Sequence, residues 1–171
     1  TGSEVLVPTP GYPLYDFLPV MENVKSVNYS LVPRLTESQT KLIWEIDFEI
    51  LERNINRNTK AIIIVEPNNP TGSRLTVSDS KKLVDLCQQK NLVLIVDEVF
   101  SDYYKEYYLS QPFTKANCIF LNGISKTLAL PQMKLSWMYL SGEPEFVAQL
   151  KEGLEIVADS FLSVNMPVQL G

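Results

Sequence analysis

Residues 61–72 read AIIIVEPNNPTG, an apolar run that stops abruptly at a turn rich in proline and asparagine. A second run of the same kind, LVLIVDE, occupies residues 92–98. Short, nearly continuous stretches of Ile, Val and Leu are typical of strands that are buried on both faces of a parallel sheet. Such strands need a crossover connection, and the residues between the two runs are numerous enough to form one. The two runs therefore predict two buried strands of a largely parallel sheet.

Working outward, helical and extended patterns alternate along the rest of the chain. The spacing of apolar residues predicts a helix over 77–90, with Thr76 and Asp79 as a capping pair. Further helices are expected over 48–57 after the cap Asp47, and from Pro144 to about 161, with Pro167 breaking or ending the last one. Residues 12–24 form a fourth helical segment, interrupted by Pro19, and more strands are expected at 4–8, 26–32, 118–123 and 137–142. This alternation predicts a three-layer α/β/α sandwich around a mostly parallel sheet.

Composition narrows the classes of function. The 171 residues suffice for one domain, and a net charge of −5 argues against nucleic acid or an anionic membrane as a partner. The sequence has no histidine, which removes Ser/His and Cys/His nucleophile pairs and most zinc sites, and no metal site is expected. Its two cysteines lack metal-like spacing and suit a reducing compartment, so a cytoplasmic location is expected.

Polar side chains follow three of the predicted strands. Asn69 lies in the turn after the first buried run, Asp97 ends the second, and Lys126 follows the strand CIFLNG. Ligands of open α/β sheets bind outside the carboxyl ends of the strands. We therefore expect an amide, a carboxylate and an amine to converge on one edge of the sheet.

Each of these groups has a simpler interpretation when taken alone. PNNPTG is good turn chemistry, and a single lysine is most often a solvated surface residue. The Asp97–Glu98 pair is similar to the magnesium-binding carboxylates of P-loop ATPases, but the required G-x-x-x-x-G-K-[ST] loop is absent from the sequence. Only the three groups together, in this order, indicate a specific site.

In that order PNNPTG, VDEVF and NGISKT resemble the motifs of the class I/II pyridoxal-phosphate (PLP)-dependent aminotransferases. The resemblance covers nearly the whole chain, including PTPGYPLY at 8–15 and EGLEIVA at 152–158, and leans toward the alanine-aminotransferase-like branch. It implies the large domain of fold type I, with one antiparallel strand at 137–142. It also implies that residues 1–171 are part of this PLP-binding domain, without the N-terminal arm and the C-terminal small domain.

The resemblance assigns roles to six residues. It implies that Lys126 forms a Schiff base with pyridoxal 5′-phosphate and later moves the substrate α-proton, while Asp97 pairs with the pyridine nitrogen and makes the ring an electron sink. The remaining cofactor contacts are implied for Asn69 at the phenolic oxygen, Tyr12 on the ring face, and Ser125 and Lys134 at the phosphate.

The sequence departs from the family pattern at two places. Phe100 stands where relatives commonly have a tyrosine whose hydroxyl contacts the phenolic oxygen, so a perturbed Schiff-base pKa, or compensation by another donor, is expected. Gln132, Lys134 and Ser136 replace a G-x-R-x-G pattern. Lysine keeps the positive charge of arginine but lacks its planar, bidentate fork, which predicts a looser or water-mediated phosphate contact.

The function implied is transfer of an amino group between an amino acid and a 2-oxo acid, in a full-length homodimer. The isolated segment is expected to have little or no activity, because the arginine for the substrate carboxylate would lie in the small domain. Two alternatives share the same motifs. One is another fold type I PLP enzyme, such as a carbon–sulfur lyase or a cyclopropane-forming synthase, and the other is a non-catalytic aminotransferase-like domain, for example the sensor domain of a transcription regulator.

Overall fold

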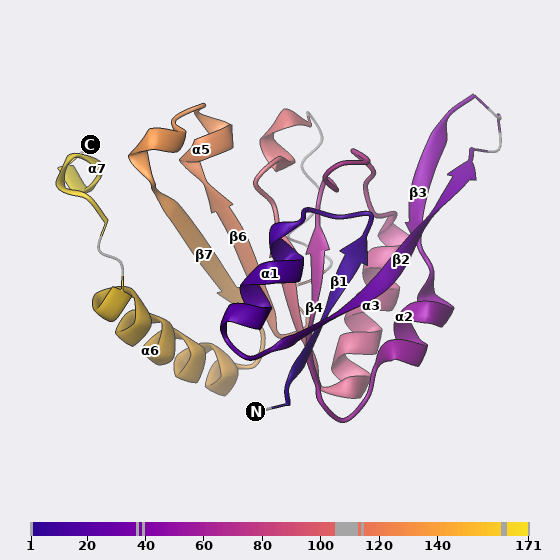
Figure 1. Ribbon diagram of the computed structural model, residues 1–171, viewed down its shortest axis with the longest axis horizontal. Helices are drawn as coiled ribbons and strands as arrows, with labels where there is room; N and C mark the ends of the chain where they lie inside the picture. The colour runs from indigo at the N-terminus through magenta and orange to yellow at the C-terminus, as the bar shows by residue number, and fades with distance from the viewer. Residues whose placement is uncertain are drawn as a thin grey trace.

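The two apolar runs form adjacent parallel strands near the middle of a seven-stranded sheet (Figure 1). The structure is a computed structural model that describes residues 2–36, 38, 40–104, 113, 115–161 and 164–170. Across the sheet the order is β3-β2-β1-β4-β5-β6-β7. The strands are β1 (Glu4–Thr9), β2 (Lys25–Leu35), β3 (Leu42–Ile46), β4 (Thr59–Val65), β5 (Val93–Asp97), β6 (Cys118–Gly123) and β7 (Ser136–Ser141).

The parallel part of the sheet comprises β2, β1, β4, β5 and β6, and an antiparallel strand closes each end. The mostly parallel α/β fold is thus confirmed, as is the antiparallel direction of β7. The prediction of a single antiparallel strand is wrong, because β3 pairs antiparallel with β2 as well. The five residues of β3 lie at the edge of the sheet and only Ile46 among them is buried, so this strand lacks the apolar run that marks the inner strands.

The described residues also form six helices and two short 3₁₀ turns. They are α1 (Leu14–Met21), α2 (Phe48–Asn54), α3 (Val77–Lys90), η1 (Ser101–Tyr103), α5 (Ile124–Thr127), η2 (Pro131–Met133), α6 (Pro144–Phe161) and α7 (Met166–Leu170). The bounds of α3 match the prediction, whereas α2 ends three residues before the expected residue 57. Pro167 does not end α6, since it lies in the first turn of α7, where the missing amide proton of proline removes no helical hydrogen bond.

Pro19 lies inside α1 without ending it. A proline at this position cannot donate to the carbonyl oxygen of Tyr15, four residues earlier. The Ser26 hydroxyl on β2 donates to that carbonyl instead, at 3.0 Å. The helix therefore continues through Pro19, because a side chain of the neighbouring strand satisfies the Tyr15 carbonyl.

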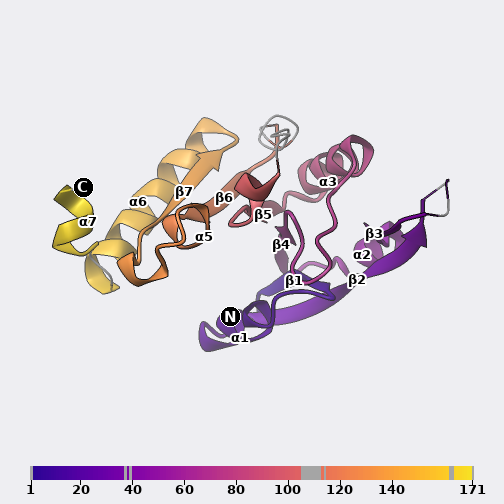
Figure 2. The same ribbon diagram turned by 90° about the horizontal axis from the view of Figure 1, so that it is seen from above.

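Two apolar cores lie on opposite faces of the sheet. The larger core packs α3 and Leu51 of α2 against β1, β4, β5 and β6. The smaller core places Tyr15 of α1 against Val5, Val7 and Ile63 on the other face. Figure 2 shows α3 and α1 on the two sides of the sheet, as expected for three layers. Helix α6 packs next to β7, but none of the residues of α6 is buried.

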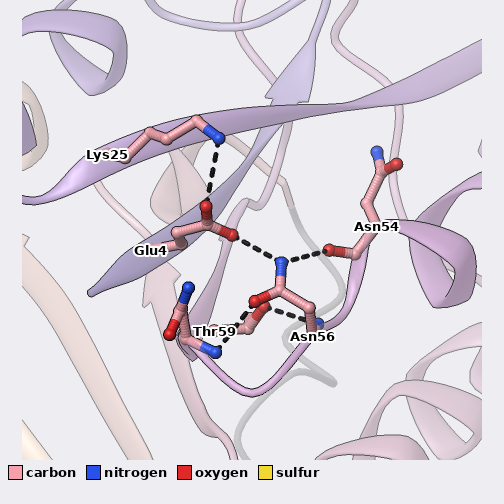
Figure 3. Close-up of polar contacts among 6 residues, drawn as sticks. Glu4, Lys25, Asn54, Asn56 and Thr59 are labelled. Atoms are coloured by element: carbon pink, nitrogen blue, oxygen red, sulfur yellow. Dashed lines mark hydrogen bonds and ion pairs between the residues drawn. The ribbon is translucent and has the colours of Figure 1, made fainter. Parts of the chain in front are cut away.

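A polar cluster fixes the edge of the sheet at which β1, β2 and β4 begin (Figure 3). Glu4 is only 8% exposed, and its carboxylate accepts hydrogen bonds from Asn56 Nδ2 at 2.6 Å and from Lys25 Nζ at 3.0 Å. These two contacts lower the pKa of Glu4, the Asn56 bond contributing most. The Thr59 hydroxyl accepts from the Asn56 backbone at 3.0 Å, which ties the start of β4 to the same cluster.

The amino end of α3 is capped as its sequence predicts. Thr76 Oγ1 accepts a hydrogen bond from the Asp79 backbone amide at 3.0 Å and donates to the Asp79 carboxylate at 2.8 Å. Since α3 supplies Leu83, Leu86 and Cys87 to the larger core, the cap also supports the packing beneath β4 and β5.

We predict that Thr76→Ala lowers the free energy of unfolding by about 1 kcal/mol, because it leaves an amide at the start of α3 without its acceptor. Urea denaturation followed by circular dichroism measures this change. Ser78→Ala, two residues further along the same exposed turn, is the matched control and should cost less than about 0.5 kcal/mol. Equal losses for the two variants would show that the cap does not stabilise α3.

Candidate active site

The register of the parallel strands brings the predicted polar groups to one edge of the sheet. Asp97, the last residue of β5, pairs in register with Val65 at the end of β4 and with Leu121 on β6. The Asp97 carbonyl accepts from the Glu66 amide at 2.8 Å, so the pairing continues to the carboxyl end of β4. The turn that contains Asn69 and the helix that carries Lys126 thus begin on either side of Asp97, at the upper edge of the sheet in Figure 1.

Asp97 is 8% exposed and both of its carboxylate oxygens have protein partners. Oδ2 accepts from the Tyr15 hydroxyl at 2.5 Å, and Oδ1 accepts from the Val99 amide at 3.1 Å. Tyr15 lies 82 residues earlier in the chain and was not predicted as a site residue. Its spacing of three residues after Tyr12 is the only sequence signal, since residues so spaced share one face of a helical turn.

The loop after β1 carries Tyr12 toward the same place. Tyr12 is 41% exposed, and its ring meets the ring of Tyr15 edge-on, with centroids 6.2 Å apart and planes at 80°. Gly11 is needed just before it, because a Cβ at that position would collide with the carbonyl oxygen of Pro8. The tight turn is thus followed by an aromatic side chain that is exposed enough to stack on a planar ligand.

In the turn after β4, Asn68 holds the loop together and Asn69 is left partly exposed. Asn68 Oδ1 accepts from the hydroxyl of Thr71 at 2.8 Å, and its Nδ2 donates to the Pro10 carbonyl at 3.4 Å. The second contact joins the β4 turn to the loop that carries Tyr12. Sequence reasoning did not single out Asn68, whose role follows from burial that the turn motif does not reveal.

Lys126 lies on the short helix α5, which the segment after Asp97 anchors at two points. Tyr103 donates to the Lys126 carbonyl at 3.0 Å, and Thr127 donates to Asp102 at 2.6 Å. The ammonium group of Lys126 lies 5.8 Å from the centre of the Phe100 ring, within the range of a cation–π contact. Phe100 is three residues after Asp97, so this contact links α5 to the segment that follows β5.

Gly123 positions the remaining predicted residues. A Cβ there would lie 2.8 Å from the Leu135 carbonyl oxygen, so only glycine allows the start of β7 to approach so closely. The Ile124 amide then donates to that carbonyl at 3.1 Å, which places the Lys134 segment beside Ser125 and α5. Lys134 itself is exposed, in the left-handed conformation with φ of 55°.

The structure shows where the three residues that depart from the family pattern, Gln132, Lys134 and Ser136, lie. Gln132 and Ser136 are exposed like Lys134. The left-handed backbone that glycine favours falls on Lys134 itself. Without the family glycines this segment still forms a turn at η2, and the Asn165 side chain stabilises the turn by donating to the Met133 carbonyl at 2.6 Å.

The structure links the six predicted residues to different degrees. Tyr12 and Asp97 are connected through Tyr15, and Lys126 is connected to the same strand end through Phe100. Asn69 reaches this group through its neighbour Asn68, while Ser125 and Lys134 join it through the backbone of α5 and β7. Among the described residues no three His, Cys, Asp or Glu side chains gather where they could hold a metal ion, and no helix there is long and apolar enough to cross a membrane.

Next to the asparagine turn, the buried carboxyl group of Glu66 faces the partly exposed guanidinium group of Arg74. Glu66 is 2% exposed and lies 3.5 Å from Arg74 Nε, and its carboxylate also accepts from the Leu75 amide at 2.9 Å. The Arg74 guanidinium stacks on the Tyr104 ring at 4.9 Å, and the hydroxyl of Tyr104 donates to the Gly72 carbonyl at 2.9 Å. Burial raises the pKa of Glu66 to about 7, although its hydrogen bond with Leu75 and the charge of Arg74 oppose the increase.

Comparison with known proteins identifies the family. Residues 1–170 match the family model described as aminotransferase class I and II. The chain belongs to the class I and II aminotransferases. It is 30% identical over 172 aligned positions to the glutamate-pyruvate aminotransferase AlaA of Haemophilus influenzae, covering 98% of this chain and 41% of that protein.

Solved aminotransferase structures share the fold. Alanine aminotransferase from Pyrococcus furiosus superposes with a TM-score of 0.84 at 28% identity, over 98% of this chain and 42% of that one. A PLP-bound protein from Clostridium difficile 630 has the same fold, with a TM-score of 0.76 at 21% identity over 97% of this chain and 42% of its own. This aminotransferase chain spans about two fifths of the length of the relatives it matches.

The arrangement of donors fits the cofactor of this family. A pyridine ring needs a buried anionic partner for its nitrogen, which Asp97 offers, and an aldehyde needs an accessible amine, which the exposed Lys126 offers. The Asp97 carboxylate can still accept a hydrogen bond from a ligand, because a carboxylate accepts about four hydrogen bonds and Tyr15 and Val99 provide two. Ligands in such folds bind at the carboxyl edge of the sheet, where Asp97 ends β5 and α5 follows β6.

We predict that the pH dependence of stability contains a contribution from Glu66. Its pKa is raised in the folded state from 4.5 to about 7, so between these values the folded protein binds the extra proton and unfolding becomes easier as the pH rises. Glu66→Gln removes this contribution, and its stability relative to wild type should increase by up to about 3 kcal/mol from pH 4.5 to pH 7.5.

Urea denaturation at several pH values measures this difference. Glu22→Gln, which changes an exposed carboxyl group, is the control and should leave the profile parallel to that of the wild type. Parallel profiles for wild type and Glu66→Gln would mean that Glu66 remains ionised when buried.

Proposed function

We propose that the full-length protein containing this chain transfers an amino group between an amino acid and a 2-oxo acid, with PLP held by Lys126. The observation that carries the proposal is the contact of the Lys126 amine, at 5.8 Å, with the ring of Phe100, which follows the buried Asp97 by three residues. Family membership supports the reaction class, and the named alanine and glutamate-pyruvate aminotransferases among its relatives suggest small substrates of this type.

Each residue has a defined task in this proposal. Bound PLP supplies an aldehyde and a ring that accepts electrons. Lys126 would hold the cofactor through its Nζ, and its amine, when free, would act as the base and acid that moves the proton of the substrate α-carbon. Asp97 would pair with the pyridine nitrogen, because a nearby negative charge favours the protonated ring.

The remaining cofactor contacts are proposed for the residues around this pair. Asn69 would hydrogen-bond the phenolic oxygen, and Tyr12 would stack its open face on the ring. Ser125 and Lys134 would bind the phosphate from the two segments that Gly123 brings together. As an exposed ammonium group at the end of η2, Lys134 would act as a point charge rather than as a bidentate clamp.

The proposal extends to the whole protein. Residues 1–171 would form part of the PLP-binding large domain, and a homodimer containing further domains would complete the substrate pocket. Cys87 and Cys118 are buried free thiols, and the pKa of each is raised to about 12 by burial. Such unreactive thiols are compatible with the reducing cytoplasm that we propose as its location.

The paired lysines provide a matched test of the reaction. We predict that Lys126→Ala abolishes the visible absorption band that forms when PLP is added, and slows the conversion of bound cofactor by alanine about 10³-fold or more. Lys134→Ala should keep the band but require a higher PLP concentration, because it removes only a phosphate contact. Stopped-flow absorption measures both effects. A Lys126→Ala protein that reacts like the wild type would refute the proposal.

A wild-type protein that binds PLP but is not converted by alanine or other amino acids would favour a different PLP reaction or a non-catalytic domain.

A second prediction concerns Phe100, which offers no hydroxyl near the Lys126 amine. In Phe100→Tyr the new hydroxyl can donate to the anionic phenolic oxygen of the cofactor. A hydrogen bond to the charged form favours deprotonation, so the midpoint of the pH-dependent absorption change should fall, by about one pH unit. Phe146→Tyr, on α6 beyond the opposite end of β7, is the control. An unchanged midpoint in Phe100→Tyr would indicate that another donor already fills this role.

A further inference from the structure

Tyr15 makes the most direct protein contact with the proposed cofactor partner Asp97. Its hydroxyl donates to Asp97 Oδ2 at 2.5 Å, a length typical of a hydrogen bond from a neutral hydroxyl to a carboxylate. The two residues come from α1 and β5, which are far apart in sequence, so the bond closes one side of the site. None of the sequence motifs assigns a role to Tyr15.

The phenol of Tyr15 is held in its donating form. Burial, and then the negative charge of Asp97, raise the pKa of Tyr15 above its ordinary value of 10. The hydroxyl therefore keeps its proton throughout the pH range in which enzymes work. Because a protonated phenol beside a carboxylate can only donate, the direction of the hydrogen bond is fixed.

The surroundings of Tyr15 restrict its movement. Its ring packs into the smaller core against Val5, Val7 and Ile63, and the edge of the Tyr12 ring contacts it. Its backbone carbonyl accepts from the Ser26 hydroxyl at 3.0 Å, the contact that compensates for Pro19. A side chain held on three sides can fix the orientation of a partner, because little conformational freedom remains to be lost.

We propose that Tyr15 is a positioning residue that fixes the Asp97 carboxylate for the pyridine nitrogen of PLP. This inference rests on the proposed function. The Tyr15 hydroxyl restrains Oδ2 and the Val99 amide restrains Oδ1, so the carboxyl group cannot rotate about its bond to Cβ. Each oxygen keeps one further accepting site, and a ring N–H can therefore bind without displacing either partner.

The experiment uses the full-length protein and PLP labelled with ¹⁵N in the ring. Three variants are compared with wild type: Tyr15→Phe, which removes the donor; Tyr15→His, which retains an N–H donor; and Tyr29→Phe. The last is the matched control, since the buried Tyr29 hydroxyl donates to the backbone carbonyl of Ile63 at 2.8 Å. The measurements are the PLP dissociation constant and the ¹⁵N chemical shift of the bound ring, with circular dichroism to verify folding.

Tyr15→Phe should raise the dissociation constant about tenfold and move the nitrogen signal toward that of unprotonated pyridine, because the loss of a hydrogen bond to a charged group leaves the carboxylate free to rotate. Tyr15→His and Tyr29→Phe should remain within about threefold of the wild type, with an unchanged signal.

The inference is overturned if Tyr15→Phe binds PLP within twofold of the wild type. It is also overturned if Phe and His weaken binding equally without moving the signal, which would indicate only a packing role. A wild-type protein that does not bind PLP would overturn the proposed function, and the inference with it.

Discussion

Asp97 places a carboxylate at the end of β5 with 8% of the residue exposed, and the surrounding edge of the sheet compensates for the cost of keeping that charge away from water. A buried carboxylate is tolerated only when its oxygens are hydrogen-bonded or paired with a positive group. Tyr15 and the Val99 amide provide two hydrogen bonds, and the proposed cofactor would provide the positive group. The same group is thus a constraint on folding and the basis of the proposed chemistry.

The scaffold delivers the other groups to Asp97 through the register of parallel strands. Since β4, β5 and β6 run in the same direction, the segments that follow them emerge at the same edge of the sheet, and Asn69 and Lys126 lie in two of those segments. Two glycines then permit close approaches that any other residue would block, Gly11 before Tyr12 and Gly123 before α5. The short helix α5 is held in place by the hydrogen bonds of Tyr103 and Thr127.

The inner strands, α3 and the edge that carries the site could be predicted from the sequence, because uninterrupted apolar runs and a capped amphipathic helix are strong local signals. The strand β3 could not, since an edge strand of five residues is only partly buried. Nor could the partner of Asp97, because a contact between residues 82 positions apart depends on the packing of α1, which Pro19 made uncertain until Ser26 was seen to satisfy the Tyr15 carbonyl. Asn68 was missed because the turn motif does not distinguish a buried asparagine from its partly exposed neighbour.

The central claim is that one particular lysine carries the cofactor at the edge formed by Asp97 and Asn69. Borohydride reduction of the full-length protein in the presence of PLP, followed by peptide mass mapping, tests it most directly, because reduction makes the attachment permanent. The account predicts a pyridoxyl group on Lys126 and on no other lysine of the chain. A modified Lys134, or an absence of any modified lysine, would contradict it.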